Sequence, residues 1–146
     1  MKLIIYTDGG ARGNPGPAGI GVAVFSPPPG REGGDEEGVR RGRLLRKYTK
    51  FLGERTNNEA EYEGVIAALE IAQEMGASEV EVRLDSELVA RQLRGIYRAK
   101  NHRMQEMVLR VRNLETKFKK VSYKNIPREK NTAADKLVNE AIDKHG

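Results

Sequence analysis

The hydrophobic pattern changes its period partway along this 146-residue chain, and the change limits the folds that the chain can adopt. Before about residue 52, three apolar or weakly alternating segments are typical of strands: 2–7, 20–25 and 44–52. From Asn58 onward, segments with helical spacing alternate with short strand-like ones. A meander of strands followed by alternating helices and strands predicts an α/β fold, a mixed sheet flanked by helices.

The later segments can be bounded from their apolar spacing and from capping residues. Helices are expected over 58–75, from Asp85-Ser86 to Gly95, over 101–118 and after Thr132, with strands at 79–84 and 121–126. The sequence has no internal repeat and no sign of a second domain, so we expect one domain spanning residues 1–146.

Two glycine- and proline-rich segments are predicted to be irregular. Asp8-Gly9-Gly10 is expected to end the first strand, and residues 9–19 are expected to form a turn. Ser26 to about Gly42 is rich in Pro, Gly and charge, and we interpret it as a flexible hairpin loop.

Composition excludes several kinds of site. Cysteine is absent, so the chain has no thiol nucleophile, disulfide or cysteine zinc site, and His102 and His145 are too far apart in sequence to suggest a zinc pair. Any metal must then be held by carboxylates. The N-terminal apolar run is too short for a signal peptide or a membrane span, which predicts a cytoplasmic protein without a membrane partner.

Positive charge is concentrated in one part of the chain. Residues 88–130 hold thirteen Lys/Arg and three acidic residues, a net charge of +10, whereas the whole chain carries +5. A basic block beside acidic residues suits a polyanionic substrate, although a solvated helix face is an equally ordinary explanation.

Four acidic residues lie where strands end or helices begin: Asp8, Glu61, Asp85 and Asp135. Each has an ordinary structural explanation when taken alone. Asp8 suits a turn, and Asp85 suits the N-cap of the next helix. Glu61 and Asp135 each follow a capping residue by three positions, as capping-box partners do.

Taken together, the four acids favour a metal site. On a helical wheel, Glu61 falls about 60° from the centre of the apolar stripe, whereas Glu59 and Glu63 fall about 100° and 140° away, so only Glu61 points toward the sheet. A carboxylate held there beside Asp8 and Asp85 would be repelled unless cations neutralise it. Mg²⁺ prefers oxygen ligands, and two ions about 4 Å apart can drive phosphodiester hydrolysis.

Amide side chains accompany the acids. Asn14, Asn57 and Asn58 lie in predicted turns beside the first two acidic segments. Amides can hydrogen-bond to the 2′-hydroxyl that separates RNA from DNA, although each Asn alone is as readily a turn or cap residue.

These segments occur together in one known family. In chain order they are Tyr6-Thr7-Asp8-Gly9-Gly10 with Asn14-Pro15-Gly16, Thr56-Asn57-Asn58-Glu59-Ala60-Glu61, Leu84-Asp85-Ser86, and Pro127-Arg128-Glu129-Lys130-Asn131-Thr132-Ala133-Ala134-Asp135. Their order and intervals resemble type 1 ribonuclease H over essentially the whole chain, in its histidine-lacking branch.

The resemblance implies a fold and a reaction. It implies a five-stranded mixed sheet of three antiparallel strands followed by two parallel ones. It also implies a metal-dependent endonuclease that hydrolyses the RNA strand of RNA/DNA hybrids, leaving 5′-phosphate and 3′-hydroxyl ends. The implied metals are two Mg²⁺ ions, with Mn²⁺ as a substitute, and the implied assembly is a monomer.

Site residues follow from the matched motifs. Asp8, Glu61, Asp85 and Asp135 resemble the catalytic metal ligands. Asn14, Asn57 and Asn58 resemble groups that read the RNA strand, Thr56 resembles part of a pocket for a DNA phosphate, and Arg128 is the residue we expect to contact phosphate where many members carry a loop histidine.

The chain departs from many relatives at three places. The loop histidine is absent, and its place falls on Asn125 and its neighbours. Glu87 stands where a Gln is common. A Trp- and Lys-rich protrusion is missing, so substrate grip is expected to fall to the Arg and Lys residues of 91–103.

A binding module without catalysis is the alternative from another functional class. It would bind hybrid or double-stranded RNA, but retaining four acids near a polyanion would only weaken such binding. The absence of a polymerase or DNA-binding extension favours a free-standing enzyme over a reverse transcriptase or integrase core. Cleavage of RNA/RNA duplexes, the metal used in the cell and protein partners are left open.

Overall fold

Five strands form one sheet in the order β3-β2-β1-β4-β5. The computed structural model describes residues 1–28 and 42–145. The strands are β1 (Lys2–Ala11), β2 (Gly16–Phe25), β3 (Leu44–Arg55), β4 (Glu79–Leu84) and β5 (Lys120–Asn125). β1, β2 and β3 are antiparallel, whereas β4 pairs in parallel with β1 and β5 in parallel with β4. The predicted mixed sheet is confirmed.

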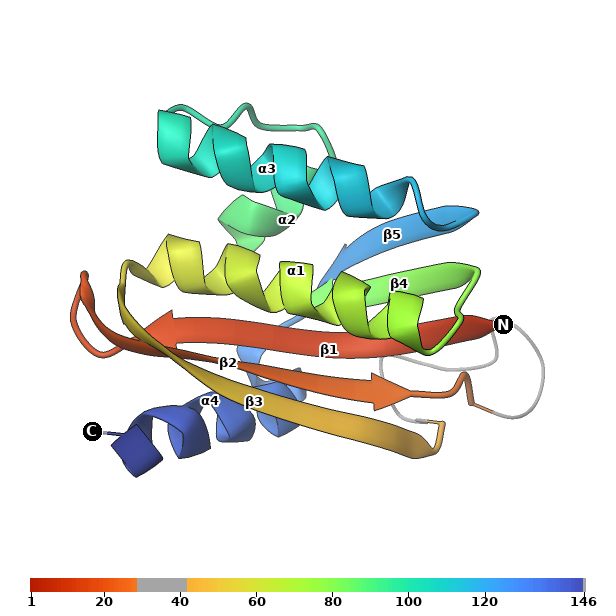
Figure 1. Ribbon diagram of the computed structural model, residues 1–146, viewed down its shortest axis with the longest axis horizontal. Coiled ribbons are helices and arrows are strands. Elements are labelled where there is room, and N and C mark those ends of the chain that lie inside the picture. Colours follow the sequence, from red (N-terminus) through yellow and green to blue (C-terminus); the bar gives the residue numbers. More distant parts are fainter. Residues whose placement is uncertain (29–41, 146) are drawn as a thin grey trace.

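Helices cover both faces of this sheet (Figure 1). They are α1 (Asn57–Glu74), α2 (Glu87–Leu93), α3 (His102–Glu115) and α4 (Thr132–His145), with a 3-10 turn η1 (Arg128–Lys130) before α4. α1, α2 and α3 lie on one face, and α4 lies on the other. The predicted helices are all present, and α3 ends three residues before the expected end at Phe118 because residues 117 and 118 form tighter i→i−3 bonds.

Alternation along β1 explains the two layers. Leu3 and Ile5 are fully buried in the core cluster that β1 shares with α1, where Val65 and Leu69 pack. The intervening Ile4 belongs to the smaller cluster on the other face. Because both faces of β1 are covered, its apolar run is continuous, as the sequence indicated.

The expectation that Asp8-Gly9-Gly10 ends the first strand is wrong. β1 continues to Ala11 and β2 begins at Gly16, with register pairs running as far as Ala11 and Ala18. The glycines serve close packing, because a Cβ on Gly9 would lie 2.0 Å from the Ala60 carbonyl oxygen of α1. The irregular turn predicted over residues 9–19 is therefore confined to the four residues between the two strands.

Glycines on β2 allow α4 to pack closely against the other face of the sheet. A Cβ on Gly21 would lie 2.3 Å from the Ala134 carbonyl oxygen at the start of α4, and one on Gly19 would lie 2.9 Å from the Ala141 Cβ. These two glycines let α4 approach the sheet, and this approach places Asp135 beside the end of β1.

The flexible hairpin loop predicted from Ser26 to Gly42 lies largely outside the described residues. In the ranges 1–28 and 42–145, no helix is both long and apolar enough to cross a membrane.

Candidate active site

The site lies where β1 extends beyond its parallel neighbour. The β1–β4 register ends at Tyr6 and Arg83, and β4 itself ends at Leu84, whereas β1 runs on to Ala11. Between these two carboxyl ends the sheet opens, and backbone groups of β1 face the gap. The carboxyl ends of parallel strands are the usual place for ligands in α/β folds.

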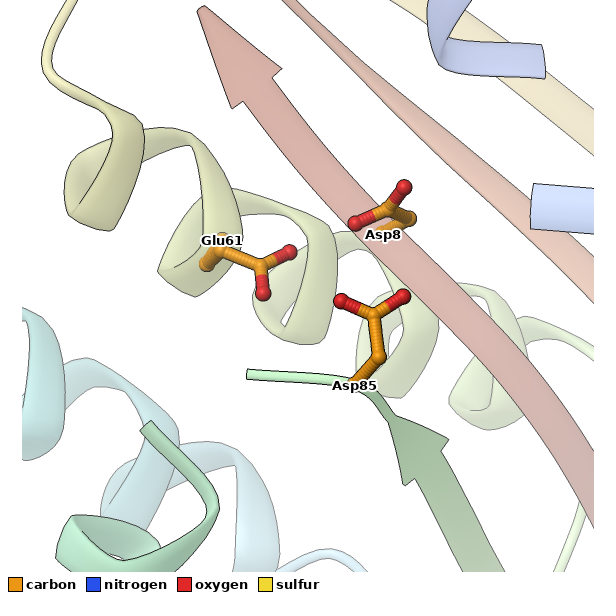
Figure 2. A group of neighbouring side chains, drawn as sticks. All are labelled: Asp8, Glu61 and Asp85. Atoms are coloured by element: carbon orange, nitrogen blue, oxygen red, sulfur yellow. The ribbon is translucent and has the colours of Figure 1, made fainter. Parts of the chain in front are cut away.

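Three carboxylates meet at this gap (Figure 2). Asp8 comes from β1, Glu61 from the first turns of α1, and Asp85 directly follows β4. Each offers an oxygen, and the three oxygens all lie within 4.8 Å of one another. The Gly9 N–H donates to Asp8 Oδ1 at 3.0 Å and to Glu61 Oε1 at 2.6 Å, so one backbone donor orients two of the carboxylates.

Asp135 lies on the wall of the same cleft, in the first turn of α4. It is not one of the three carboxylates that approach within 4.8 Å. Its Oδ1 lies 3.8 Å from Nη2 of Arg128, a residue whose side chain is 81% exposed. The structure therefore brings three of the four predicted ligands together and holds the fourth nearby.

The cleft has a volume of about 270 Å³. Its lining joins the acids to polar, basic and apolar side chains: Asp8, Gly9, Gly10, Ala11, Arg12, Asn57, Glu61, Asp85, Arg128, Asp135, Val138, Asn139 and Ile142. The cleft thus has acidic side chains at its base and arginine side chains at its margin.

Burial makes the negative charge at the base of the cleft costly. Asp8 and Glu61 are 8% and 4% exposed. Burial, assisted by the charges of Asp85 and Asp135, raises the pKa of Asp8 to about 7, against the lowering effect of its hydrogen bonds. Burial and the neighbouring Asp8 raise the pKa of Glu61 well above its usual value. A bound cation would remove this repulsion.

The donor set fits a hard divalent cation. Every candidate ligand atom at the gap is a carboxylate oxygen, and neither histidine of the chain lines the cleft. Mg²⁺ and Mn²⁺ prefer such oxygens, whereas zinc favours nitrogen and sulfur. The side chains at the gap therefore offer the oxygen donors that a hard divalent cation prefers.

The ordinary explanations offered for Asp8, Glu61 and Asp85 do not hold in this structure. The N-cap of α1 is Thr56, and its capping-box partner is Glu59. Ser86, not Asp85, caps α2, with its hydroxyl accepting from the Val89 N–H at 3.2 Å. Asp8 lies within a strand and not in a turn. Since Glu61 and Asp85 are not needed as caps, their carboxylates face the gap for another reason.

The orientation predicted for the glutamates of α1 is confirmed. Glu61 is buried against the end of β1, where its Oε1 accepts from Gly9. Glu59 pairs with Arg103 of α3 at 2.9 Å, and Glu63 pairs with Arg55 of β3 at 2.8 Å. The two flanking glutamates thus join α1 to its neighbours and do not face the gap.

The amides predicted to read RNA tie the β1–β2 turn to α1. Asn14 Oδ1 accepts from the Asn57 N–H at 2.9 Å, and Asn57 Oδ1 accepts from the Ala11 N–H at 3.1 Å. In the described ranges neither Nδ2 has a hydrogen-bond partner, and both residues are exposed. Their oxygens are held by the fold, and their donors face solvent.

The remaining predicted substrate residues have different surroundings. The Thr56 hydroxyl accepts from the Glu59 N–H at 3.2 Å as the cap of α1, and Asn58 is exposed. Arg128 lines the cleft. Asn125, at the place of the missing histidine, donates from Nδ2 to the Leu84 carbonyl at 3.2 Å and so fastens the end of β5 to β4.

Sequence reasoning missed residues that line or support the cleft. Arg12 joins the β1–β2 turn to α4, pairing with Asp143 at 2.7 Å and donating to Asn139 Oδ1 at 3.2 Å. Asn131 is completely buried beside Asp85. The i, i+4 spacing of Asn139 and Asp143 on α4 was visible, but nothing in the sequence connected it with a residue 127 positions away.

The basic block is spread over α2, α3 and β5, and part of it is already paired. Arg91 bonds Glu87, Arg103 bonds Glu59, and Arg112 bonds Glu115. Arg94 and Arg98 are exposed and have no ion-pair partner in the described part of the chain.

Comparison with known proteins identifies the class. A family model described as reverse transcriptase-like matches residues 6–141. Among curated relatives, ribonuclease HI of Halobacterium salinarum is 40% identical over 144 residues, which is 97% of this chain and 65% of that protein. The bifunctional protein Rv2228c of Mycobacterium tuberculosis is 37% identical over 98% of this chain, which spans only 36% of that protein's length.

Solved structures agree. RNase H1 of Halobacterium salinarum superposes with a TM-score of 0.87 at 38% identity and covers 99% of both chains. LC11-RNase H1 in complex with an RNA/DNA hybrid superposes with a TM-score of 0.83 at 46% identity and covers 98% of both chains. The chain belongs to the type 1 ribonuclease H family.

Proposed function

We propose that this protein is a ribonuclease H, a metal-dependent endonuclease that hydrolyses the RNA strand of RNA/DNA hybrids. One observation carries the proposal: three carboxylates from separate elements meet within 4.8 Å at the open end of the sheet. A relative of similar structure has been solved with an RNA/DNA hybrid, which supports the choice of substrate. The expected products carry 5′-phosphate and 3′-hydroxyl ends.

Asp8, Glu61, Asp85 and Asp135 are the proposed metal ligands and catalytic residues. Two Mg²⁺ ions, or Mn²⁺ in their place, would supply activation of the attacking water and stabilisation of the leaving 3′-oxygen. The chain's own contribution is to hold the ligands in place. The Gly9 N–H fixes two carboxylates, and the docking of α4 fixes Asp135 near them.

Asn14, Thr56, Asn57, Asn58 and Arg128 are the proposed substrate-binding residues. The exposed Nδ2 groups of Asn14 and Asn57 are donors that suit 2′-hydroxyl or ribose oxygens of the RNA strand. Arg128 at the cleft margin is permanently charged and suits a phosphate. We propose that this arrangement orients the hybrid so that the RNA strand crosses the carboxylates.

The gel assay that tests the proposal uses four labelled substrates: RNA/DNA, RNA/RNA, DNA/DNA and single-stranded RNA, each with Mg²⁺, Mn²⁺ or EDTA. Cutting of the RNA in RNA/DNA, lost with EDTA and with Asp85→Asn, is the expected result. Binding of hybrid without cutting under every metal condition would instead favour the alternative, an inactive module that binds hybrid or double-stranded RNA. Whether RNA/RNA is also a substrate is read from the same gel.

We further propose that residues 1–146 act as one monomeric domain in the cytoplasm. The described residues share a single sheet, which supports one domain. Sedimentation of the purified protein at micromolar concentration would test the assembly state.

A further inference from the structure

Asn131 is a buried polar residue that the proposed site does not yet include. It lies between η1 and α4 and is 0% exposed. A polar side chain is rarely buried this completely unless its hydrogen bonds justify the position. Its bonds connect the separate parts of the site.

The amide of Asn131 donates two hydrogen bonds. Nδ2 bonds the Thr7 carbonyl at 3.0 Å and Asp85 Oδ2 at 2.9 Å. The Thr7 main-chain carbonyl can only accept a hydrogen bond, so the NH₂ end of the amide must face it, and this sets the orientation of the side chain. In the described part of the chain, Asn131 Oδ1 is buried without a partner. The two donated bonds are therefore retained although the oxygen is left unsatisfied, which is unfavourable for a buried acceptor.

The Asn131 side chain donates to β1 at the point where the pairing of β1 with β4 has ended. The β1–β4 register stops at Tyr6, so the Thr7 carbonyl is the next group along β1 in the gap. The side chain of Asn131 supplies the donor that β4 no longer provides there. The same amide reaches Asp85, the residue that follows β4.

The backbone of Asn131 is hydrogen-bonded to the two residues on the other wall of the cleft, Arg128 and Asp135. Its N–H donates to the Arg128 carbonyl at 2.9 Å, and its carbonyl accepts from the Asp135 N–H at 3.1 Å. Asn131 is thus bonded to Asp85 and to the neighbour of Asp8 through its side chain, and to Asp135 and Arg128 through its main chain.

We infer that Asn131 is a positioning residue that fixes the Asp85 carboxylate relative to Asp8 and so sets the spacing of the metal ligands. The inference rests on the proposed function of this site. With Oδ2 of Asp85 engaged by Asn131, the other carboxylate oxygen is left for a cation. Partners of this kind, which bind a ligand and not the metal, are typically worth about 10- to 100-fold in metal affinity or activity.

The test compares Asn131→Ala and Asn131→Ser with wild type and with Asn113→Ala. Asn113 is an exposed residue of α3 and serves as the matched control. Mn²⁺ binding is measured without substrate, by electron paramagnetic resonance of the free ion, and hybrid cleavage is measured separately. We expect Asn131→Ala to weaken Mn²⁺ binding about tenfold or more and to lower kcat similarly, with KM for hybrid within about twofold of wild type.

Asn131→Ser retains one donor and should fall between wild type and Asn131→Ala. It also carries the test if the alanine variant is unfolded at the assay temperature. A purely structural residue would lower the melting temperature in EDTA without changing Mn²⁺ affinity. If both variants are folded and bind Mn²⁺ as wild type does, the inference is overturned. If wild type binds Mn²⁺ but cuts no hybrid, the proposed function fails, and the Mn²⁺ comparison still decides the role of Asn131.

Discussion

Without metal, the carboxylate of Asp8 should destabilise the folded protein at neutral and alkaline pH. Burial raises its pKa from 3.8 to about 7, so the folded state holds a proton that the unfolded chain has released. For an acid with a raised pKa, the folded state is favoured below the unfolded value of 3.8 and progressively loses this advantage as the pH rises through about 7. Asp8→Asn keeps the shape of the side chain and removes the charge.

The size of the effect follows from the shift. A change of about three pKa units corresponds to on the order of 4 kcal/mol above pH 7, and to less than about half of that at pH 5. For a chain of this length, each kcal/mol moves the melting temperature by about 2–4 °C. Asp8→Asn should therefore melt roughly 10 °C higher than wild type at pH 8 in EDTA, with a much smaller difference at pH 5.

Circular dichroism melts in EDTA at pH 5 and pH 8 would measure this difference. Glu54→Gln is the control, because it removes one negative charge from an exposed side chain and should change little. Added Mn²⁺ should raise the melting temperature of wild type far more than that of Asp8→Asn. Equal or lower stability of Asp8→Asn at pH 8 in EDTA would refute the view that the site is electrostatically strained without cations.

Three further predictions concern cleavage of hybrid. Glu61→Gln should be inactive, whereas Glu63→Gln should cut nearly as wild type does. The reverse order of rates would contradict the assignment of Glu61 as the glutamate that acts at the gap. A combined Arg94→Ala and Arg98→Ala variant should raise KM more than it lowers kcat and should flatten the dependence of binding on salt; an unchanged salt slope would make these arginines a solvated surface only. Arg128→Ala should cut about tenfold more slowly or bind hybrid more weakly. The pH–rate profile should rise from neutral to mildly alkaline pH in both wild type and this variant, and a profile of altered shape in the variant would point to a proton-transfer role for Arg128.

The sequence predicted the sheet and helices well because their apolar periods are strong. Strand 79–84 alternates along its length, and helix 58–75 has a full stripe, so each was located within about a residue. The ends of β1 and β2 were predicted wrongly because glycine is read as a turn former. Gly9 is instead a place where the backbone of α1 approaches the strand, and this depends on contacts that no local pattern records.

For the site, the direction of Glu61 could be predicted from a helical wheel because the helix has one buried face. The role of Asn131 could not, because its partners are the Thr7 carbonyl and Asp85, which are 124 and 46 positions away. The pairing of Arg103 with Glu59 was likewise invisible, and it removes one arginine from the set expected to hold substrate. Such contacts depend on how helices and strands pack against one another in space, and the spacing of residue types along the sequence does not predict them.

The docking of α4 determines when the cleft is completed during synthesis of the chain. A chain emerging from the ribosome would expose Asp8, Glu61 and Asp85 well before α4 is made. Until that last segment folds back, the gap lacks Asn131 and Asp135, and Arg12 has no α4 side chain to bond. A nascent chain would therefore carry most of the acidic residues of the proposed nuclease site without their final arrangement, and the proposed cleavage of hybrid would require α4 to have folded.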